Sequence, residues 1–223
     1  MRADDYIDYV LDPGQEPKGT WERGDWPSLQ KLGIPLYCGT LDPHRYFPAS
    51  HHFWTIFHPS PSFTPDWSHY LPRFYKRACW QRAHHYLYLA APGALTPLHF
   101  DFWDTHAYLC QVTGSKFCVL FSPEDSEHIY RGAIDPLALD FSRHPNARQA
   151  VAWVGMLREG QTLFVPSRWW HYVVTERTSI TLSYDWFDST NCRSYLKHSS
   201  RLVWQVYVNR LRRAFTRRPR AGR

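Results

Sequence analysis

The stretch LTPLHFDFWDTHAYLCQVTGSKFCVLF, residues 95–121, predicts the fold of this chain. It joins three short runs that are rich in Val, Leu, Phe, Tyr and Thr, and Gly114 and Ser115 separate the last two. Runs of this composition, bounded by turn residues, are typical of β-strands. Similar runs occur at residues 85–93, 161–167, 171–176 and 179–187. We therefore expect an all-β core, folded as a barrel or jelly roll.

The regions outside these runs indicate flanking segments of the same domain. Residues 1–83 show no sustained period apart from a short helix expected at residues 26–32, and we expect them to wrap the core. Between residues 124 and 158 the β signal fades, which predicts a turn of helix and an irregular excursion. The barrel itself is expected at residues 84–190. Beyond it, residues 191–223 have helical apolar spacing, which predicts a basic C-terminal helix that caps the barrel or pairs with a second subunit.

Composition excludes several classes of protein. With 223 residues, 43% of them hydrophobic and 17% aromatic, the chain can bury the core of one domain and is not disordered. Five scattered cysteines without a C-x-x-C pair, an acidic N-terminus and the lack of a long apolar run predict a soluble cytoplasmic protein. The net charge of +6 is uneven, because residues 191–223 hold ten Lys or Arg and no acidic residue. The rest of the chain is mildly acidic.

The motif that carries chemistry is His99-Phe100-Asp101, with His171 far downstream. In a strand, residues i and i+2 point to the same face, so His99 and Asp101 can aim at one point inside a barrel. His171 lies between two β-like runs and can supply a third ligand from another strand. Two imidazoles and one carboxylate leave open positions on a metal, as non-haem iron(II) requires. An H-x-D pair alone is weak, since His99 can equally be a hydrogen-bonded strand histidine and Asp101 an edge carboxylate.

Four sequence blocks, in the same order, resemble the Jumonji C-like, cupin-like protein hydroxylases, the group that includes the factor-inhibiting-HIF asparaginyl hydroxylase. The blocks are TPLHFD, CQVTGSKFCVLFSP, DFSRHPNARQA and LREGQTLFVPSRWWHYV, and the resemblance covers about residues 84–187. It implies a double-stranded β-helix, and it implies that His99, Asp101 and His171 hold iron(II). It also implies that Lys116 and Thr96 bind the distal carboxylate of 2-oxoglutarate, the co-substrate used together with molecular oxygen.

Other positions around the motifs are less determined. Tyr88 lies on the strand before the metal motif and can donate its hydroxyl to the co-substrate, although a strand tyrosine is more often part of a core. Ser183 or Asp185 stands where the family often places a polar residue near the co-substrate, and we assign a role to neither.

The sequence also departs from the family pattern. About two additional residues separate Asp101 from Lys116, and a frequent His-Asn pair appears here as His106-Ala107. We expect His106 or Thr105 to compensate for the missing amide. The usual Gly-Asp before the last ligand is Gly160-Gln161, which we interpret as a change in a turn.

The resemblance implies a 2-oxoglutarate-dependent dioxygenase that hydroxylates a C–H bond of a protein, peptide or amino-acid-like substrate and releases succinate and carbon dioxide. Two alternatives remain: a metal-binding cupin that acts as an isomerase or hydrolase, and a barrel that serves as a non-catalytic binding module. Lys116 argues against the first and the intact set of three ligands against the second. The arginine-rich end is the only feature that favours nucleic-acid binding, and such tails are mostly solvated. Two roles stay open for the C-terminal helix, which can cap the barrel or form a homodimer.

Overall fold

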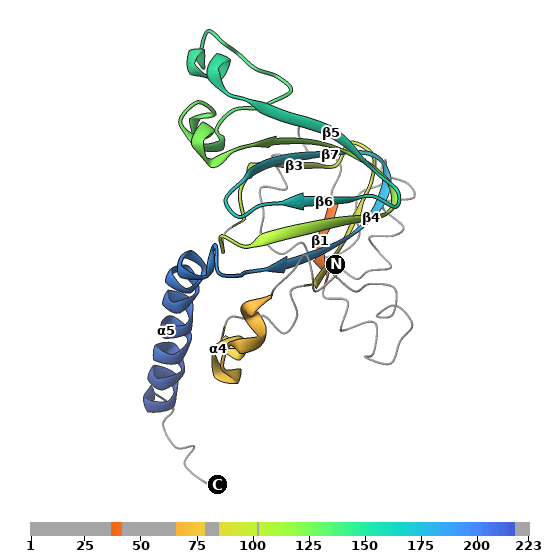
Figure 1. Cartoon of the computed structure of the whole chain (residues 1–223). Helices are drawn as coiled ribbons and strands as arrows, with labels where there is room; N and C mark the ends of the chain where they lie inside the picture. The colour runs from red at the N-terminus through yellow and green to blue at the C-terminus, as the bar shows by residue number, and fades with distance from the viewer. Residues whose placement is uncertain (1–36, 42–65, 79–84, 102, 217–223) are drawn as a thin grey trace.

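The computed structural model describes residues 37–41, 66–78, 85–101 and 103–216 (Figure 1). In these residues seven strands form one antiparallel sheet that curls on itself. The strands are β1 (Tyr37–Leu41), β2 (His85–Ala90), β3 (Leu95–His99), β4 (His106–Phe121), β5 (Ala152–Arg158), β6 (Thr162–Val165) and β7 (Trp170–Trp186). Their order is β1-β2-β7-β4-β5, while β3 also pairs with β7 and β6 with β4. The predicted all-β core of jelly-roll type is confirmed.

The two longest strands, β4 and β7, pair along almost their whole length, from His106 opposite Trp186 to Phe121 opposite Trp170. The register of this pairing shifts between Gln111 and Lys116. On its other edge, β4 pairs first with β6 and then, past the shift, with β5. Bulges of this kind bend a strand and increase its twist, so one strand can serve both halves of a barrel.

Side chains on the two faces of β4 enter different clusters. Val119 and Phe121 pack with Leu98, Trp170 and Tyr172 in a core that also includes residues of the 122–150 segment. The opposite face of β4 contributes a second cluster, which lies inside the curl of the sheet: Ala107, Cys118, Leu120, Leu157, Val165 and Val173. This inner cluster borders the candidate site.

The segment after β4 contains the short 3₁₀ helices η3 (Pro123–Ser126), η4 (Tyr130–Gly132) and η5 (Pro145–Gln149), as the fading β signal predicted. The prediction was wrong for β5, which is a regular strand within the region assigned to the excursion. Residues 152–155 are exposed, so β5 has no alternation of buried and exposed positions at its start. Its pairing with β4, and not a local pattern, makes it a strand.

The expected C-terminal helix is present as α5 (Cys192–Thr216), which leads away from the end of β7 beside α4 (Arg73–Ala78) (Figure 1). The Tyr75 and Ser199 hydroxyls lie 2.5 Å apart, and Tyr75 and Tyr207 both pack against Val203. The 3₁₀ helix η2 (Trp67–Tyr70) precedes α4. In the described part of the chain no helix has the length and apolar character to cross a membrane. The helix expected at residues 26–32, and most of the segment 1–83, lie outside the described residues, so the proposed division of the chain stays a prediction.

Gly114 and Gly160 provide a matched test of the bend in β4. Both have φ of +78°, a conformation that favours glycine, but a Cβ at Gly114 would overlap the carbonyl oxygen of Thr178, whereas one at Gly160 meets nothing within 4 Å. We expect Gly160→Ala to lower the free energy of unfolding by roughly 1–2 kcal/mol, the cost of the left-handed conformation. Gly114→Ala should cost about 1–3 kcal/mol more because of overpacking. Denaturant titration of both variants measures the difference, and equal losses would contradict the close packing at the bend.

Candidate metal site

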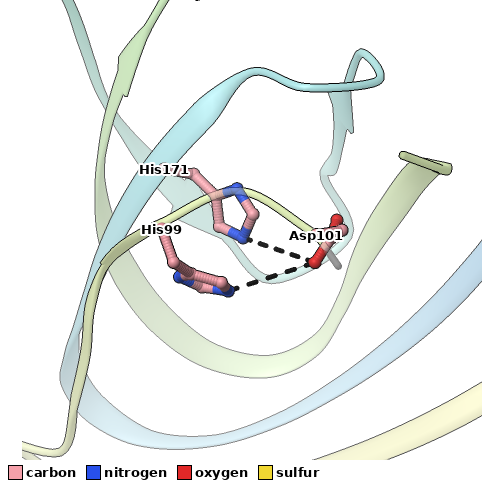
Figure 2. A group of neighbouring side chains, drawn as sticks. All are labelled: His99, Asp101 and His171. Carbon is pink, nitrogen blue, oxygen red and sulfur yellow. Dashed lines mark ion pairs between the residues drawn. The ribbon is translucent and has the colours of Figure 1, made fainter. Parts of the chain in front are cut away.

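Three side chains from two parts of the fold meet inside the curled sheet (Figure 2). His99 is the last residue of β3, and it stands opposite His171 in the pairing of β3 with β7. Asp101 lies two residues beyond β3, so only His99 of the H-x-D pair is in the strand. The Asp101 Oδ1 atom is 4.0 Å from the His99 Nε2 atom and 3.9 Å from the His171 Nε2 atom.

The ligand atoms of these residues all lie within 4.8 Å of one another, and no other such group of His, Cys, Asp or Glu occurs among the described residues. The sequence prediction named the same three residues.

Hydrogen bonds to backbone carbonyl oxygens orient both imidazoles. The His99 Nδ1 atom is 2.8 Å from the carbonyl oxygen of Pro97, and the His171 Nδ1 atom is 3.2 Å from that of Trp169. A carbonyl only accepts, so each Nδ1 donates and the Nε2 lone pairs are directed toward Asp101. Metal-binding histidines are held in this way by partners behind them.

The environment keeps His171 in the form that binds metals. Its exposed fraction is 8%, and burial lowers the pKa of its imidazole. A neutral imidazole is the ligand form, because a protonated ring has no lone pair to donate. The set therefore fits iron(II): two imidazoles and a carboxylate on one side, with the remaining positions open.

A cavity of about 80 Å³ adjoins the three residues, and Tyr88, Thr96 and Lys116, which the sequence analysis assigned to the co-substrate, also line it. This volume is too small to enclose a large substrate, which would have to reach the cavity from its mouth. The lining consists of Tyr88, Thr96, His99, Asp101, Ala107, Leu109, Lys116, Val165, His171, Val173, Ser183 and Asp185.

Lys116 is the cation of this cavity. Its exposed fraction is 8%, and burial lowers the pKa of its ammonium group to about 8. The Lys116 Nζ atom lies 5.9 Å from the centre of the Tyr88 ring, a cation–π distance. Within the ranges that the structure describes, no carboxylate lies within 4.0 Å of this ammonium group. A buried ammonium without an anion is costly, so the position favours an anionic ligand.

The structure corrects the expectation about the missing amide. Neither His106 nor Thr105 is among the residues that line the cavity. The His106 Nδ1 atom accepts the backbone N–H of Ser167, and its Nε2 atom is 3.1 Å from the Thr190 hydroxyl, so the ring is held elsewhere. Alternation along β4 explains this, since Ala107 faces the cavity and its neighbour His106 therefore faces the other way.

Two residues without an assigned role, Ser183 and Asp185, do line the cavity. The Ser183 hydroxyl donates a hydrogen bond of 3.2 Å to the Asp185 Oδ1 atom. Burial, followed by the charge of Asp101, raises the pKa of Asp185 well above its ordinary value. The only sequence signal for both residues was their position on the last strand of the barrel.

A curled antiparallel sheet with two imidazoles and a carboxylate at one cavity defines a cupin with a site suited to a metal. Residues 29–193 match the family described as the cupin-like domain. The match covers most of the chain, which therefore belongs to this family.

Several curated proteins are similar to part of this chain. Jumonji C domain-containing protein 5 of Drosophila melanogaster is 32% identical over 108 residues, which are 44% of this chain and 26% of that protein. Human tRNA wybutosine-synthesizing protein 5 is 31% identical over 103 residues, or 44% and 32% of the two chains. Lysine-specific demethylase JMJ30 of Arabidopsis thaliana is 29% identical over 111 residues, or 46% and 25%. The matched region thus spans a quarter to a third of these relatives, and the predicted resemblance to Jumonji C proteins is confirmed.

We expect His99→Ala and Asp101→Ala each to abolish iron(II) binding. Each change removes one of three protein ligands, and the remaining pair cannot fix the geometry of the site. Anaerobic equilibrium dialysis, with the retained iron quantified, measures the effect. His69→Ala is the matched control, since the side chain of His69 is 78% exposed and lies outside the cavity. Iron bound by His99→Ala or Asp101→Ala as tightly as by the control would rule out these ligands.

Proposed function

We propose that this chain is an iron(II)- and 2-oxoglutarate-dependent oxygenase. In this proposal His99, Asp101 and His171 hold the iron, and the substrate is a protein, a peptide or an amino-acid-like molecule. Bound iron and 2-oxoglutarate supply the oxidation by molecular oxygen, which hydroxylates a C–H bond and releases succinate and carbon dioxide. Support comes from the cupin-like family, from the donor set and above all from Lys116.

The single observation that carries the proposal is a buried ammonium group in the same small cavity as the metal donors. A metal held by two imidazoles and a carboxylate has no need of a nearby cation, and a cation there repels it. A dicarboxylate ligand accounts for both positive groups, because one end can reach the metal while the other pairs with Lys116. The charge-assisted hydrogen bond offsets the desolvation of both groups.

The remaining cavity residues fit the binding of such a co-substrate. We assign the Thr96 hydroxyl, and with it the Tyr88 hydroxyl, to hydrogen bonds with the distal carboxylate beside Lys116, since all three residues line the cavity. Leu109, Val165 and Val173 form apolar walls between these groups. Such walls exclude water, and they strengthen the electrostatic interactions inside the cavity.

Lys116 also separates this function from the alternatives. An isomerase or hydrolase that uses a metal in the same barrel has no role for a buried cation near the donors. A non-catalytic binding module has no reason to direct three ligand atoms at one point. The proposal therefore makes binding of 2-oxoglutarate the property to test.

We expect Lys116→Ala to raise the dissociation constant of 2-oxoglutarate by roughly thirtyfold to several thousandfold. Loss of one member of a buried charge pair costs about 2–5 kcal/mol, and 1.4 kcal/mol corresponds to about tenfold. Anaerobic calorimetric titration of the iron(II) protein measures this constant. Lys197→Ala, which removes an exposed lysine of α5, is the control. Iron affinity without 2-oxoglutarate should not fall in either variant, and an unchanged dissociation constant in Lys116→Ala would favour the alternatives.

The pH dependence of the same titration has a defined sign. Because the pKa of Lys116 is about 8, its ammonium is protonated below pH 8 and loses its charge as the pH rises through that value. Binding of 2-oxoglutarate needs the charged form, so the dissociation constant should be lowest below pH 8 and then rise by about tenfold per pH unit. Lys116→Arg stays charged throughout, so its dissociation constant should not change with pH over this range. That constant should be higher than in the unsubstituted protein, because the planar fork of arginine does not fit a pocket shaped for an ammonium. A flat profile in the unsubstituted protein would contradict the role of Lys116.

A further inference from the structure

Asp185 is the one cavity carboxyl that the proposed machinery leaves without a function. It lies near the end of β7, opposite Ala107 of β4 in the strand register, and both residues line the cavity beside the metal donors. Directly opposed residues on one face of a sheet have Cβ atoms about 5 Å apart. Because alanine carries only a methyl group, the space in front of the Asp185 carboxyl is not filled by the neighbouring strand.

The carboxyl has few partners for a group in this position. Its Oδ1 atom accepts the Ser183 hydroxyl, and in the described part of the chain no Lys, Arg or His nitrogen lies within 4.0 Å of it. It is also not a fourth metal ligand, because the ligand atoms that lie within 4.8 Å of one another belong to His99, Asp101 and His171 alone. A carboxylate in such a place requires a cation or a proton.

This inference rests on the proposed function, and the charged groups of that function leave no cation for Asp185. Iron(II) and the Lys116 ammonium carry three positive charges, while the Asp101 carboxylate and the two carboxylates of 2-oxoglutarate carry three negative charges. The loaded cavity is therefore balanced before Asp185 is counted. An ionised Asp185 makes it negative, so it attracts a cation that arrives after 2-oxoglutarate.

We infer that Asp185 binds a cationic group of the substrate, an ammonium or a guanidinium, and thereby places a neighbouring C–H bond near the metal. Ser183 positions the carboxyl through its hydrogen bond, and Ala107 leaves room for the incoming side chain or amine. The substrate class is a cationic molecule, either a lysine or arginine side chain of a polypeptide or a free amine or guanidine. Asp185 is thus a specificity-determining residue of the proposed oxygenase.

Calorimetric titrations of the anaerobic iron(II) protein test this inference without turnover. One arm uses end-blocked pentapeptides with a central lysine, arginine or norleucine flanked by glycines, because norleucine has nearly the shape of lysine without its charge. The other arm uses n-butylammonium, n-butylguanidinium and neutral 1-butanol, which distinguishes a free small molecule from a polypeptide. Each probe is titrated with and without saturating 2-oxoglutarate.

We expect a cationic probe of at least one arm to bind roughly tenfold to a hundredfold more tightly than its neutral counterpart, the range of a charge-assisted hydrogen bond. This preference should depend on 2-oxoglutarate, since the cavity without it carries excess positive charge. Asp185→Asn should abolish the preference and leave the neutral probes unchanged, while Asp185→Glu keeps part of it. Asp140→Asn, which removes an exposed carboxyl of the 122–150 segment, should keep it in full.

Equal affinities for cationic and neutral probes in both arms, with normal 2-oxoglutarate binding, would overturn the inference and leave the proposed function intact. The inference also fails if Asp185→Asn keeps the preference, or if this variant lowers iron affinity as loss of a ligand would. Failure of the unsubstituted protein to bind 2-oxoglutarate instead contradicts the proposed function. In that case a preference for cations would not depend on 2-oxoglutarate, so the two failures are distinguishable.

Discussion

The antiparallel pairing of β3 with β7 is the constraint on which the site depends. It sets His99 directly opposite His171, although the two residues are far apart in the chain. Because side chains alternate along a strand, a slip of one residue in this register would direct one imidazole to the opposite face of the sheet. The ring centres are 4.2 Å apart, and Asp101 completes the group just beyond the end of β3. The backbone carbonyls of Pro97 and Trp169 then fix the rings.

The long pairing of β4 with β7 supplies the remaining part of the site. β4 carries Ala107 and Lys116 on either side of the bulge, while β7 carries His171 at its start and Asp185 near its end. One pair of strands therefore provides a candidate metal ligand, a buried cation and a second carboxyl to the same cavity. Rigid strands hold such groups more precisely than loops do. This suits a site whose charged groups must keep their positions before a ligand binds.

The sequence predicted those features that short-range chemistry encodes. Turn residues and β-forming runs indicated the barrel, and the H-x-D spacing together with the ordered motifs named the three ligand candidates and Lys116. The strand β5 was missed because Trp153 and Val154 are 62% and 64% exposed, so this edge strand has no alternating pattern. The orientation of His106 was also missed.

The position of Asp185 opposite Ala107 also has no local pattern in the sequence and could not be predicted from it. It depends on the register between β4 and β7, which are distant in sequence, and no local pattern specifies that register. The helical spacing after residue 191 was sufficient to predict α5, since its period is a property of the segment itself.

The proposed function requires one cavity to hold iron(II) and 2-oxoglutarate together. Its most direct test is the visible spectrum of the anaerobic iron(II) protein during addition of 2-oxoglutarate, compared with addition of succinate, which lacks the keto group. A keto acid bound to iron through its keto and carboxylate oxygens gives a weak charge-transfer band. We expect a band that rises to saturation with one equivalent of 2-oxoglutarate and is absent with succinate. A protein that binds both iron(II) and 2-oxoglutarate but shows no band would contradict it.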